Sequence, residues 1–288
     1  MTERPLAEAR RVGLIGDPVA HSLSPALQQP AFDALGIAAR YELWPTAALA
    51  LPERVATLRA PEMLGANVTV PHKQAVLGLL DVVSEQARRA GAVNTIINRN
   101  GRLHGDNTDI AGFATALVAV CFDAKDREVL LLGAGGAARG VILALETLGV
   151  RQIAVTNRHH ERARRLAAEV TPTQINVVAS NEAELESALR QARLIVNATS
   201  LGWHAGETPL ALSLLEYIPA DALVVDLTYR DTDLLLAARA RGLPTLDGLP
   251  MLIHQGARAF QLWTGQLPPL ELMRDGVQQA WAARESAT

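Results

Sequence analysis

The sequence predicts an α/β protein with mostly parallel sheets, and three observations lead to this prediction. Short β-like runs alternate with helical patterns along almost the whole chain. The run 129–132 is continuously apolar, which is typical of strands that are covered on both faces. The chain has 288 residues, and a domain usually takes roughly 100–200 residues. We therefore expect two α/β domains.

The first half contains three predicted strands and a hairpin. The strands are expected at 12–15, 41–44 and 67–70, the last of them closed by Pro71. Ser24 and Pro25 fit the N-cap and first position of a helix that ends near Gly36, and a second helix is expected from about Leu51. The runs 95–97 and 103–104 flank a polar turn at 98–101, which indicates a hairpin.

The second half repeats the strand–helix alternation. Strands are expected at 129–132, 153–156, 194–196 and 223–225, and helices from the glycine-rich turn to about Leu148 and at 160–169. Two closing helices are expected at 255–264 and 270–283. There is no internal repeat and no low-complexity linker, so the domain boundary is placed within the predicted helix 110–122.

Bulk composition excludes several classes of protein. A formal net charge of −3 argues against a broad nucleic-acid or anionic-membrane surface. Cys121 is the single cysteine, so intrachain disulfides and cysteine-based zinc sites are excluded, and its apolar run 116–121 predicts a buried thiol. The histidines lack paired metal-ligand spacing. With no signal-peptide core and no apolar run of about 20 residues, a cytoplasmic protein without a membrane span is expected.

The glycine-rich segment 133–138 predicts a dinucleotide site. It follows a strand and opens a helix, which separates a fingerprint from a chance glycine cluster. Ala138 occupies the third fingerprint position, where alanine is permitted. Backbone N–H groups at the helix start would face a pyrophosphate. The alternative is an ordinary tight turn between strand and helix.

The next strand favours NADP over NAD. NAD-binding units usually place Asp or Glu at the end of this strand to bind the ribose 2′-hydroxyl. Here the strand is followed by Asn157 and Arg158, and the cation would attract a 2′-phosphate. An arginine at an ordinary surface turn is the alternative reading.

A second constellation lies in the first half of the chain. The segment 67–73 places polar groups and a lysine beyond the end of a strand, where open α/β sheets bind ligands. The polar turn 105–109 precedes a helix, but Thr108 or Asp109 could simply be its N-cap. The segment 21–25 could equally be a helix cap.

Lysine usage singles out one residue of that constellation. Of 27 basic residues only Lys73 and Lys125 are lysine, and the base composition of the gene accounts for such a bias in general. A lysine ammonium can lose its proton near neutral pH, whereas a guanidinium cannot. Lys125 lies in a polar stretch and is read as a solvated linker residue.

These motifs, in this order, resemble the shikimate dehydrogenase family. The matching stretches are 16–18, 22–25, 67–73, 91–95, 105–109 with Gly112, 133–138, 157–158, 197–202, 226 with 229, and 251–252 with 255–256. The resemblance covers nearly the whole chain. It implies NADP-linked interconversion of 3-dehydroshikimate and shikimate, a step of aromatic amino-acid synthesis.

The resemblance also implies an organisation and a set of site residues. A substrate domain of mixed, mainly parallel sheet would take 1–110 and about 265–288, and a Rossmann-like NADP(H)-binding domain about 111–264. Lys73 and Asp109 would form the catalytic pair. The implied substrate contacts are Ser22, Ser24, Asn67, Thr69, Asn94, Tyr229 and Gln255. The implied cofactor contacts are Gly133, Ala134, Gly135, Gly136, Ala137, Asn157, Arg158, Thr199, Ser200, Leu227, Gly248 and Met251.

Departures from the family pattern leave alternatives open. They are Gln28 and Gln29, His159, Trp203, Pro250, and a shortened segment after Tyr229. A relative that accepts quinate or an aminated analogue, or that prefers NAD, remains an alternative, as does a non-catalytic NADP-binding paralogue. The expected partner is a small-molecule substrate, with neither nucleic acid nor membrane, in a monomer or homodimer.

Overall fold

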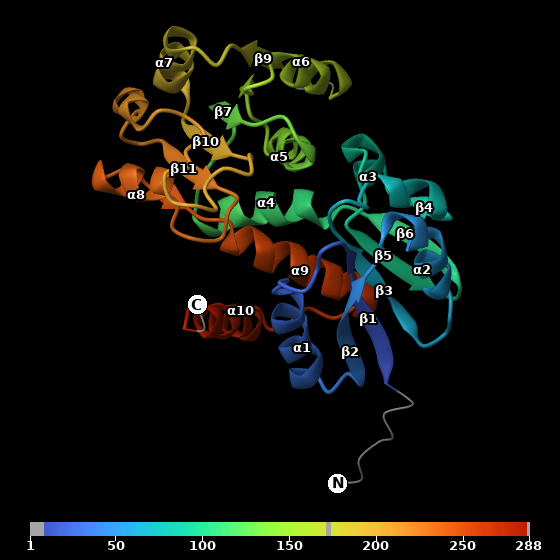
Figure 1. The fold of residues 1–288 in the computed structure, drawn as a ribbon. Coiled ribbons are helices and arrows are strands. Elements are labelled where there is room, and N and C mark those ends of the chain that lie inside the picture. The colour runs from blue at the N-terminus through green and yellow to red at the C-terminus, as the bar shows by residue number, and fades with distance from the viewer. Residues whose placement is uncertain (1–8, 171–173, 287–288) are drawn as a thin grey trace. The chain divides into compact units, whose positions relative to one another are not determined.

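The computed structural model describes residues 9–170 and 174–286 and confirms the predicted fold class. Its internal contacts divide the chain into two compact units. The first unit ends at Thr108 and resumes at Ile253, and the second is Asp109–Leu252. Each unit contains a six-stranded sheet (Figure 1). Within the described ranges, every helix is too short or too polar to cross a membrane.

The first unit is built on a mixed sheet with the strand order β2-β1-β3-β5-β6-β4. The parallel pairs are β1 with β2, β1 with β3 and β4 with β6, whereas β5 runs antiparallel to both of its neighbours. The strands are β1 (Arg10–Gly16), β2 (Ala39–Pro45), β3 (Met63–Val68), β4 (Val82–Val83), β5 (Thr95–Arg99) and β6 (Arg102–Asp106).

Helices pack on this sheet through apolar side chains. They are α1 (Ser24–Ala34), α2 (Leu51–Thr57), α3 (Glu85–Ala90), α10 (Leu270–Glu285) and most of α9 (Leu249–Thr264), with short 3-10 turns at Ala48–Ala50 and Ala75–Leu79. One side of the sheet buries a cluster that includes Ile15, Ile96 and Leu103. On the other side, Phe32 of α1 contacts Phe260 of α9 with ring centroids 4.7 Å apart. The returning C-terminal helices therefore complete the core of the first unit.

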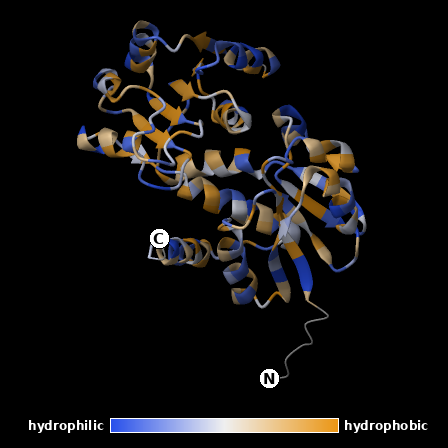
Figure 2. Cartoon of the chain, in the orientation of Figure 1, coloured by the Kyte–Doolittle hydropathy of each residue, from blue (hydrophilic) through white to orange (hydrophobic). Residues whose placement is uncertain are grey.

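The second unit is built on a parallel sheet with the order β12-β11-β10-β7-β8-β9. Its strands are strongly apolar (Figure 2). They are β7 (Glu128–Leu132), β8 (Gln152–Thr156), β9 (Ile175–Val178), β10 (Leu194–Asn197), β11 (Leu223–Asp226) and β12 (Thr245–Leu246). The helices are α4 (Thr108–Ala119), α5 (Gly136–Thr147), α6 (His160–Glu169), α7 (Glu182–Gln191) and α8 (Asp233–Ala240), with a 3-10 turn at Leu212–Tyr217.

The strand order of the second unit defines where a ligand is expected. The chain moves outward from β7 to β8 and β9, and then returns to the other side of β7 with β10. The strand order therefore reverses between β7 and β10. Open α/β sheets bind ligands beyond the carboxyl ends of the strands at such a point.

Four local predictions need correction. The third strand is Met63–Val68, so Thr69 and Val70 lie beyond it. Ser24 is the first residue of α1 and Leu23 is its N-cap, so the predicted cap was one residue late. Similarly, α4 starts at Thr108, which makes neither Thr108 nor Asp109 its N-cap.

Cys121 is the fourth correction, because its thiol is exposed and not buried. The helix α4 ends at Ala119, before the apolar run does, and Cys121 adopts a left-handed backbone with φ 56°. Val118 and Val120 are exposed as well. An apolar run that crosses the end of a helix loses the periodicity that would keep its side chains on the buried face.

Candidate functional site

The two serines predicted to bind a carboxylate lie at the start of α1. The Ser22 hydroxyl donates to Ser24 Oγ at 3.0 Å, and the Ser24 backbone N–H donates to Ser22 Oγ at 3.1 Å. Both side chains are partly exposed. Pro25 near the start of α1 needs no N–H partner there, which keeps this first turn compatible with helix geometry.

A buried polar cluster lies at the carboxyl end of β3. Asn67 Nδ2 donates to the Asn94 carbonyl oxygen and to Thr95 Oγ1, both at 3.2 Å. Asn94 Oδ1 accepts from the Thr108 N–H at 2.8 Å, which supplies an acceptor to the first turn of α4. Thr108 Oγ1 also lies 3.4 Å from Gln255 Oε1 on α9. The structure thus brings Asn67, Asn94 and Gln255 together within the first unit.

The segment after β3 is anchored through its backbone and through His72. The Thr69 N–H donates to the Ile15 carbonyl, and the Val93 N–H donates to the Lys73 carbonyl at 2.8 Å. The ring of His72 is buried and its Nε2 donates to the Thr46 carbonyl at 2.6 Å. The backbone around Lys73 is therefore bonded to β1 and to the segment just before β5, while the Lys73 side chain is partly exposed. His72 thus helps to anchor the segment that carries Lys73, a role that the sequence motif alone does not indicate.

The glycine loop has the geometry expected of a phosphate cradle. Gly133 follows β7 with φ 112°, and Gly135 is the N-cap of the twelve-residue helix α5. Gly135, Gly136 and Ala137 are exposed. A Cβ built on Gly135 or Gly136 meets nothing within 4 Å, so there is open space in front of these peptides. N–H groups in the first turn of a helix have no intrahelical partner and attract anions.

The end of β8 carries further polar groups beside that loop. The Gly133 N–H donates to the Thr156 carbonyl at 2.8 Å, which joins the loop to β8. Arg158 is exposed, and Asn157 Nδ2 donates to the His159 carbonyl at 2.9 Å. Two buried polar atoms, Thr156 Oγ1 and His160 Nδ1, have no hydrogen-bond partner in the structure. Together with the glycine cradle, these groups fit the phosphate and ribose groups of a dinucleotide.

A buried network shapes the loops after β10 and β11. Asn197 Nδ2 donates to Asp226 Oδ2 at 2.9 Å, and Asn197 Oδ1 accepts from the Thr199 N–H and hydroxyl. Asp226 also accepts from the Thr228 N–H at 3.0 Å, and the Gly248 N–H donates to the Thr228 carbonyl at 3.1 Å. These bonds set the backbone positions of Thr199, Leu227 and Gly248, three of the predicted cofactor contacts.

Two aromatic residues meet in the same part of the second unit. The rings of Trp203 and Tyr229 form an edge-to-face contact with centroids 5.3 Å apart. Arg230 Nη1 donates to the Trp203 carbonyl at 2.7 Å. Trp203, a departure from the family pattern, therefore packs directly on a predicted substrate contact. Lys73 belongs to the first unit, and Asp109 and Tyr229 belong to the second.

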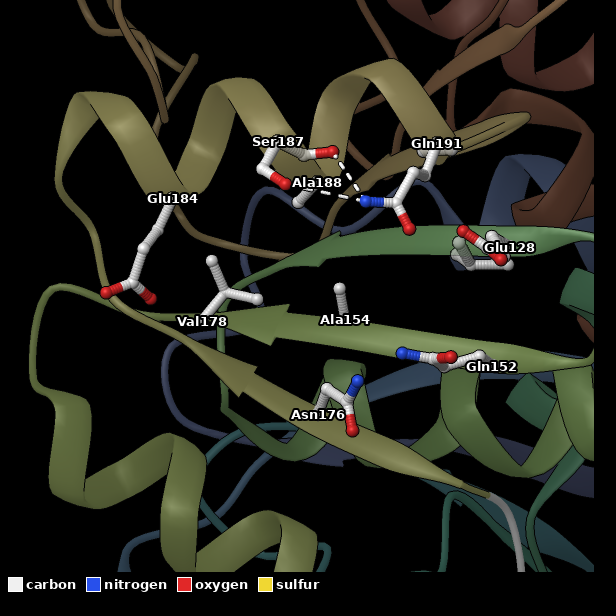
Figure 3. A pocket seen from close by; sticks show the side chains of 11 residues that line it. Glu128, Gln152, Ala154, Asn176, Val178, Glu184, Ser187, Ala188 and Gln191 are labelled. Atoms are coloured by element: carbon white, nitrogen blue, oxygen red, sulfur yellow. Dashed lines mark hydrogen bonds between the residues drawn. The ribbon is translucent and has the colours of Figure 1, made fainter.

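A separate hollow of about 240 Å³ lies elsewhere in the second unit, between α7 and strands β7 to β9 (Figure 3). Glu128, Gln152, Asn176 and Gln191 contribute polar groups to its lining. None of the predicted site residues lines it. The predicted site therefore lies outside this hollow.

Comparison with known proteins identifies the family. Residues 14–96 match the shikimate dehydrogenase substrate binding domain, residues 116–228 match shikimate / quinate 5-dehydrogenase, and residues 248–283 match the shikimate 5'-dehydrogenase C-terminal domain. A shikimate dehydrogenase (NADP(+)) of Symbiobacterium thermophilum is 43% identical over 271 residues, which cover 92% of each chain. The chain belongs to the shikimate dehydrogenase family.

Two solved structures of this family show the same fold. Shikimate 5-dehydrogenase of Thermus thermophilus, in complex with NADP(H) and shikimate, has a TM-score of 0.84 and 43% identity over 94% of this chain and 99% of its own. Quinate dehydrogenase of Corynebacterium glutamicum, in complex with NAD, has a TM-score of 0.85 and 35% identity over 94% and 99%. The two neighbours differ in substrate and in cofactor.

Proposed function

We propose that this protein is an NADP-dependent shikimate dehydrogenase, which reversibly reduces 3-dehydroshikimate to shikimate. The observation that carries the proposal is the match to enzymes of that name over nearly the full length of both chains. Within that match the chain retains Lys73 and Asp109, which argues against a non-catalytic paralogue.

The proposed acid–base group is Lys73. Reduction of a ketone requires a hydride at carbon and a proton at oxygen, and NADPH would supply the hydride when bound. An ammonium beside the carbonyl oxygen polarises it and delivers the proton, and in the reverse direction the amine removes it. Asp109 would orient Lys73 and the substrate. It directly follows Thr108, whose N–H is bound to Asn94, so the backbone at this point is well anchored.

The remaining site residues are assigned to binding. Ser22 and Ser24 would hold the substrate carboxylate, because two adjacent hydroxyls can both donate to it. Thr69, Asn94, Tyr229 and Gln255 would surround the ring and its hydroxyls, and Asn67 would support them. The first unit is thereby proposed as the substrate domain.

The second unit is proposed as the NADP domain. The open space before Gly135 and Gly136 supports a pyrophosphate at the start of α5. The exposed guanidinium of Arg158 supports recognition of a 2′-phosphate. Ala134, Ala137, Asn157, Thr199, Ser200, Leu227, Gly248 and Met251 complete the proposed contacts.

A second candidate activity is the oxidation of quinate with NAD. The similarity to a quinate dehydrogenase that binds NAD supports this second candidate. Quinate carries an additional tertiary hydroxyl beside its carboxylate, so the surroundings of Ser22 and Ser24 would decide between the two substrates.

A two-substrate, two-cofactor kinetic matrix tests the proposal. Formation of reduced nicotinamide is followed at about 340 nm for shikimate and quinate, each with NADP and NAD. We expect the highest kcat/KM for shikimate with NADP. A higher kcat/KM for quinate would identify quinate, and not shikimate, as the preferred substrate. Binding of NADP(H) without turnover of either acid would refute the proposed enzymatic activity.

A further inference from the structure

We propose that Tyr41 is a positioning residue that connects α1, at whose start the two serines lie, to Asn67 at the end of β3. This inference rests on the function proposed above, because the serines are there the carboxylate-binding pair. Tyr41 belongs to none of the sequence motifs. It lies in the middle of β2, a strand with no proposed site residue of its own.

The phenol of Tyr41 crosses the sheet to reach Asn67. Tyr41 pairs in register with Val12 of β1, and Asn67 pairs with Leu14 of the same strand, so β1 lies between them. Tyr41 Oη nevertheless donates to Asn67 Oδ1 at 2.8 Å, and both side chains are buried. Adjacent strands are about 4.8 Å apart, so a long side chain with a terminal hydroxyl is needed to bridge two strand spacings.

Glycine at position 65 leaves room for the Trp263 ring that packs beside Tyr41. Gly65 has φ 147°, and a Cβ built on it would lie 2.0 Å from the Ile96 carbonyl oxygen and 2.8 Å from Trp263 Nε1. The Trp263 ring packs beside Tyr41, with centroids 6.3 Å apart, and its Nε1 donates to Ile96 O at 2.9 Å. The ring of Tyr41 is therefore held by packing as well as by its hydroxyl.

The other side of Tyr41 faces α1. Burial raises the pKa of the Tyr41 phenol, and the neighbouring Ser24 hydroxyl offsets part of that rise. The Tyr41 backbone N–H donates to Gln29 Oε1 of α1 at 2.9 Å. The helix α1 is thus bonded to the backbone of Tyr41, and its first residue, Ser24, lies near the phenol.

These hydrogen bonds lie on two sides of the Tyr41 phenol. Ser22 donates to Ser24 near the phenol, and Tyr41 Oη donates to Asn67 Oδ1. Asn67 Nδ2 in turn donates to the Asn94 carbonyl. Because both bonds of Nδ2 fix the orientation of the amide, Asn67 Oδ1 must face the phenol. Removal of the phenol hydroxyl would leave Asn67 Oδ1 without its donor.

Tyr41→Phe keeps the ring and removes only the hydroxyl, so it is the direct test. We expect KM for shikimate to rise about fivefold, the effect of one lost neutral hydrogen bond, with kcat and KM for NADP nearly unchanged. The matched control is Tyr217→Phe, since Tyr217 is a tyrosine of the second unit that stacks on Arg190. The control should leave every kinetic constant unchanged.

A double-mutant cycle separates positioning from a general loss of packing. If Tyr41 acts through Asn67, the double variant Tyr41→Phe, Asn67→Ala should have nearly the same KM for shikimate as Asn67→Ala alone. An additive rise in KM, or an unchanged KM in Tyr41→Phe, would overturn the proposal.

A readout without turnover distinguishes failure of this inference from failure of the proposed function. The side-chain amide signals of Asn67 are followed by NMR in the wild type and in Tyr41→Phe. A shift or broadening in the variant supports the connection, even if the wild type does not oxidise shikimate. Unchanged Asn67 signals would overturn it, even in a fully active shikimate dehydrogenase.

Discussion

Two glycines of the loop after β7 should respond differently to replacement by alanine. Gly133→Ala should lower the stability of the protein, whereas Gly135→Ala should weaken NADP binding. Gly133 has φ 112°, and a Cβ built there lies 3.0 Å from the carbonyl carbon and oxygen of Ala198. The contact is with backbone, so it cannot be relieved by rotating a side chain. Gly133→Ala therefore adds backbone strain to a close contact, at a cost of about 1–3 kcal/mol.

Gly135 lies two residues later in a different environment. Its backbone is extended, with φ −101° and ψ −168°, which alanine adopts without strain. A Cβ built on it meets nothing within 4 Å. Gly135→Ala should leave the folded protein intact, or stabilise it by up to about 1 kcal/mol through the unfolded chain. The added methyl group would instead occupy the space proposed for the pyrophosphate.

Thermal unfolding with and without NADP measures both effects. A loss of 1–3 kcal/mol corresponds to a fall in Tm of roughly 2–12 °C for a domain of this size, which we expect for Gly133→Ala alone. For Gly135→Ala we expect an unchanged or higher Tm, and a Kd for NADP raised at least about tenfold, or 1.4 kcal/mol. Isothermal titration calorimetry gives the Kd directly.

Either of two results would refute this reasoning. If Gly135→Ala binds NADP as tightly as the wild type, the pyrophosphate does not lie against this glycine. If Gly133→Ala unfolds at the same temperature as the wild type, its left-handed backbone carries no strain and the loop relaxes readily.

Three further changes test the assigned chemistry and charges. Lys73→Ala should lower kcat about 10²–10⁴-fold with little change in KM. The same substitution at the exposed Lys125 provides the control. Near-normal turnover of the Lys73 variant would refute its assignment as the acid–base group. Arg158→Ala should raise KM for NADP about tenfold and leave KM for NAD unchanged, whereas equal effects on both would assign Arg158 to another role. The hydrogen-bonded Arg59 lowers the pKa of Asp81 to about 2. Because this folded-state pKa lies below the unfolded value of about 3.9, the stabilisation is present above pH 4 and is lost as the pH falls towards 2. The Tm difference between the wild type and Asp81→Asn should shrink over that range. A constant difference would show that ionised Asp81 does not stabilise the folded protein in this way.

Elements with a strong local signal were predicted well. The apolar strand β7, the glycine turn and α5 follow one another along the chain, and α6 has the predicted bounds His160–Glu169. Turns are also encoded by neighbouring residues: Asn100 and Gly101 adopt the left-handed conformations of the predicted hairpin turn. Such features need no knowledge of distant residues.

Elements that depend on distant partners were missed. The short edge strand β9 was not predicted, since its four residues gain their strand character by pairing with β8. The exposure of Cys121 follows from where α4 ends, which its apolar neighbours do not reveal.

The sequence by itself determined the α/β alternation, the glycine loop and the family, because each is encoded by residues that are close together or by motifs that keep their order. Only the tertiary structure decided how the polar cluster of the first unit is assembled. Tyr41 and Asn67 are 26 residues apart, and Thr108 and Gln255 are 147 apart. Their hydrogen bonds arise from strand order and helix packing, which bring together groups that no local pattern relates. The bond between Tyr41 and Asn67 therefore depends on β2, β1 and β3 lying side by side, which no local sequence pattern shows.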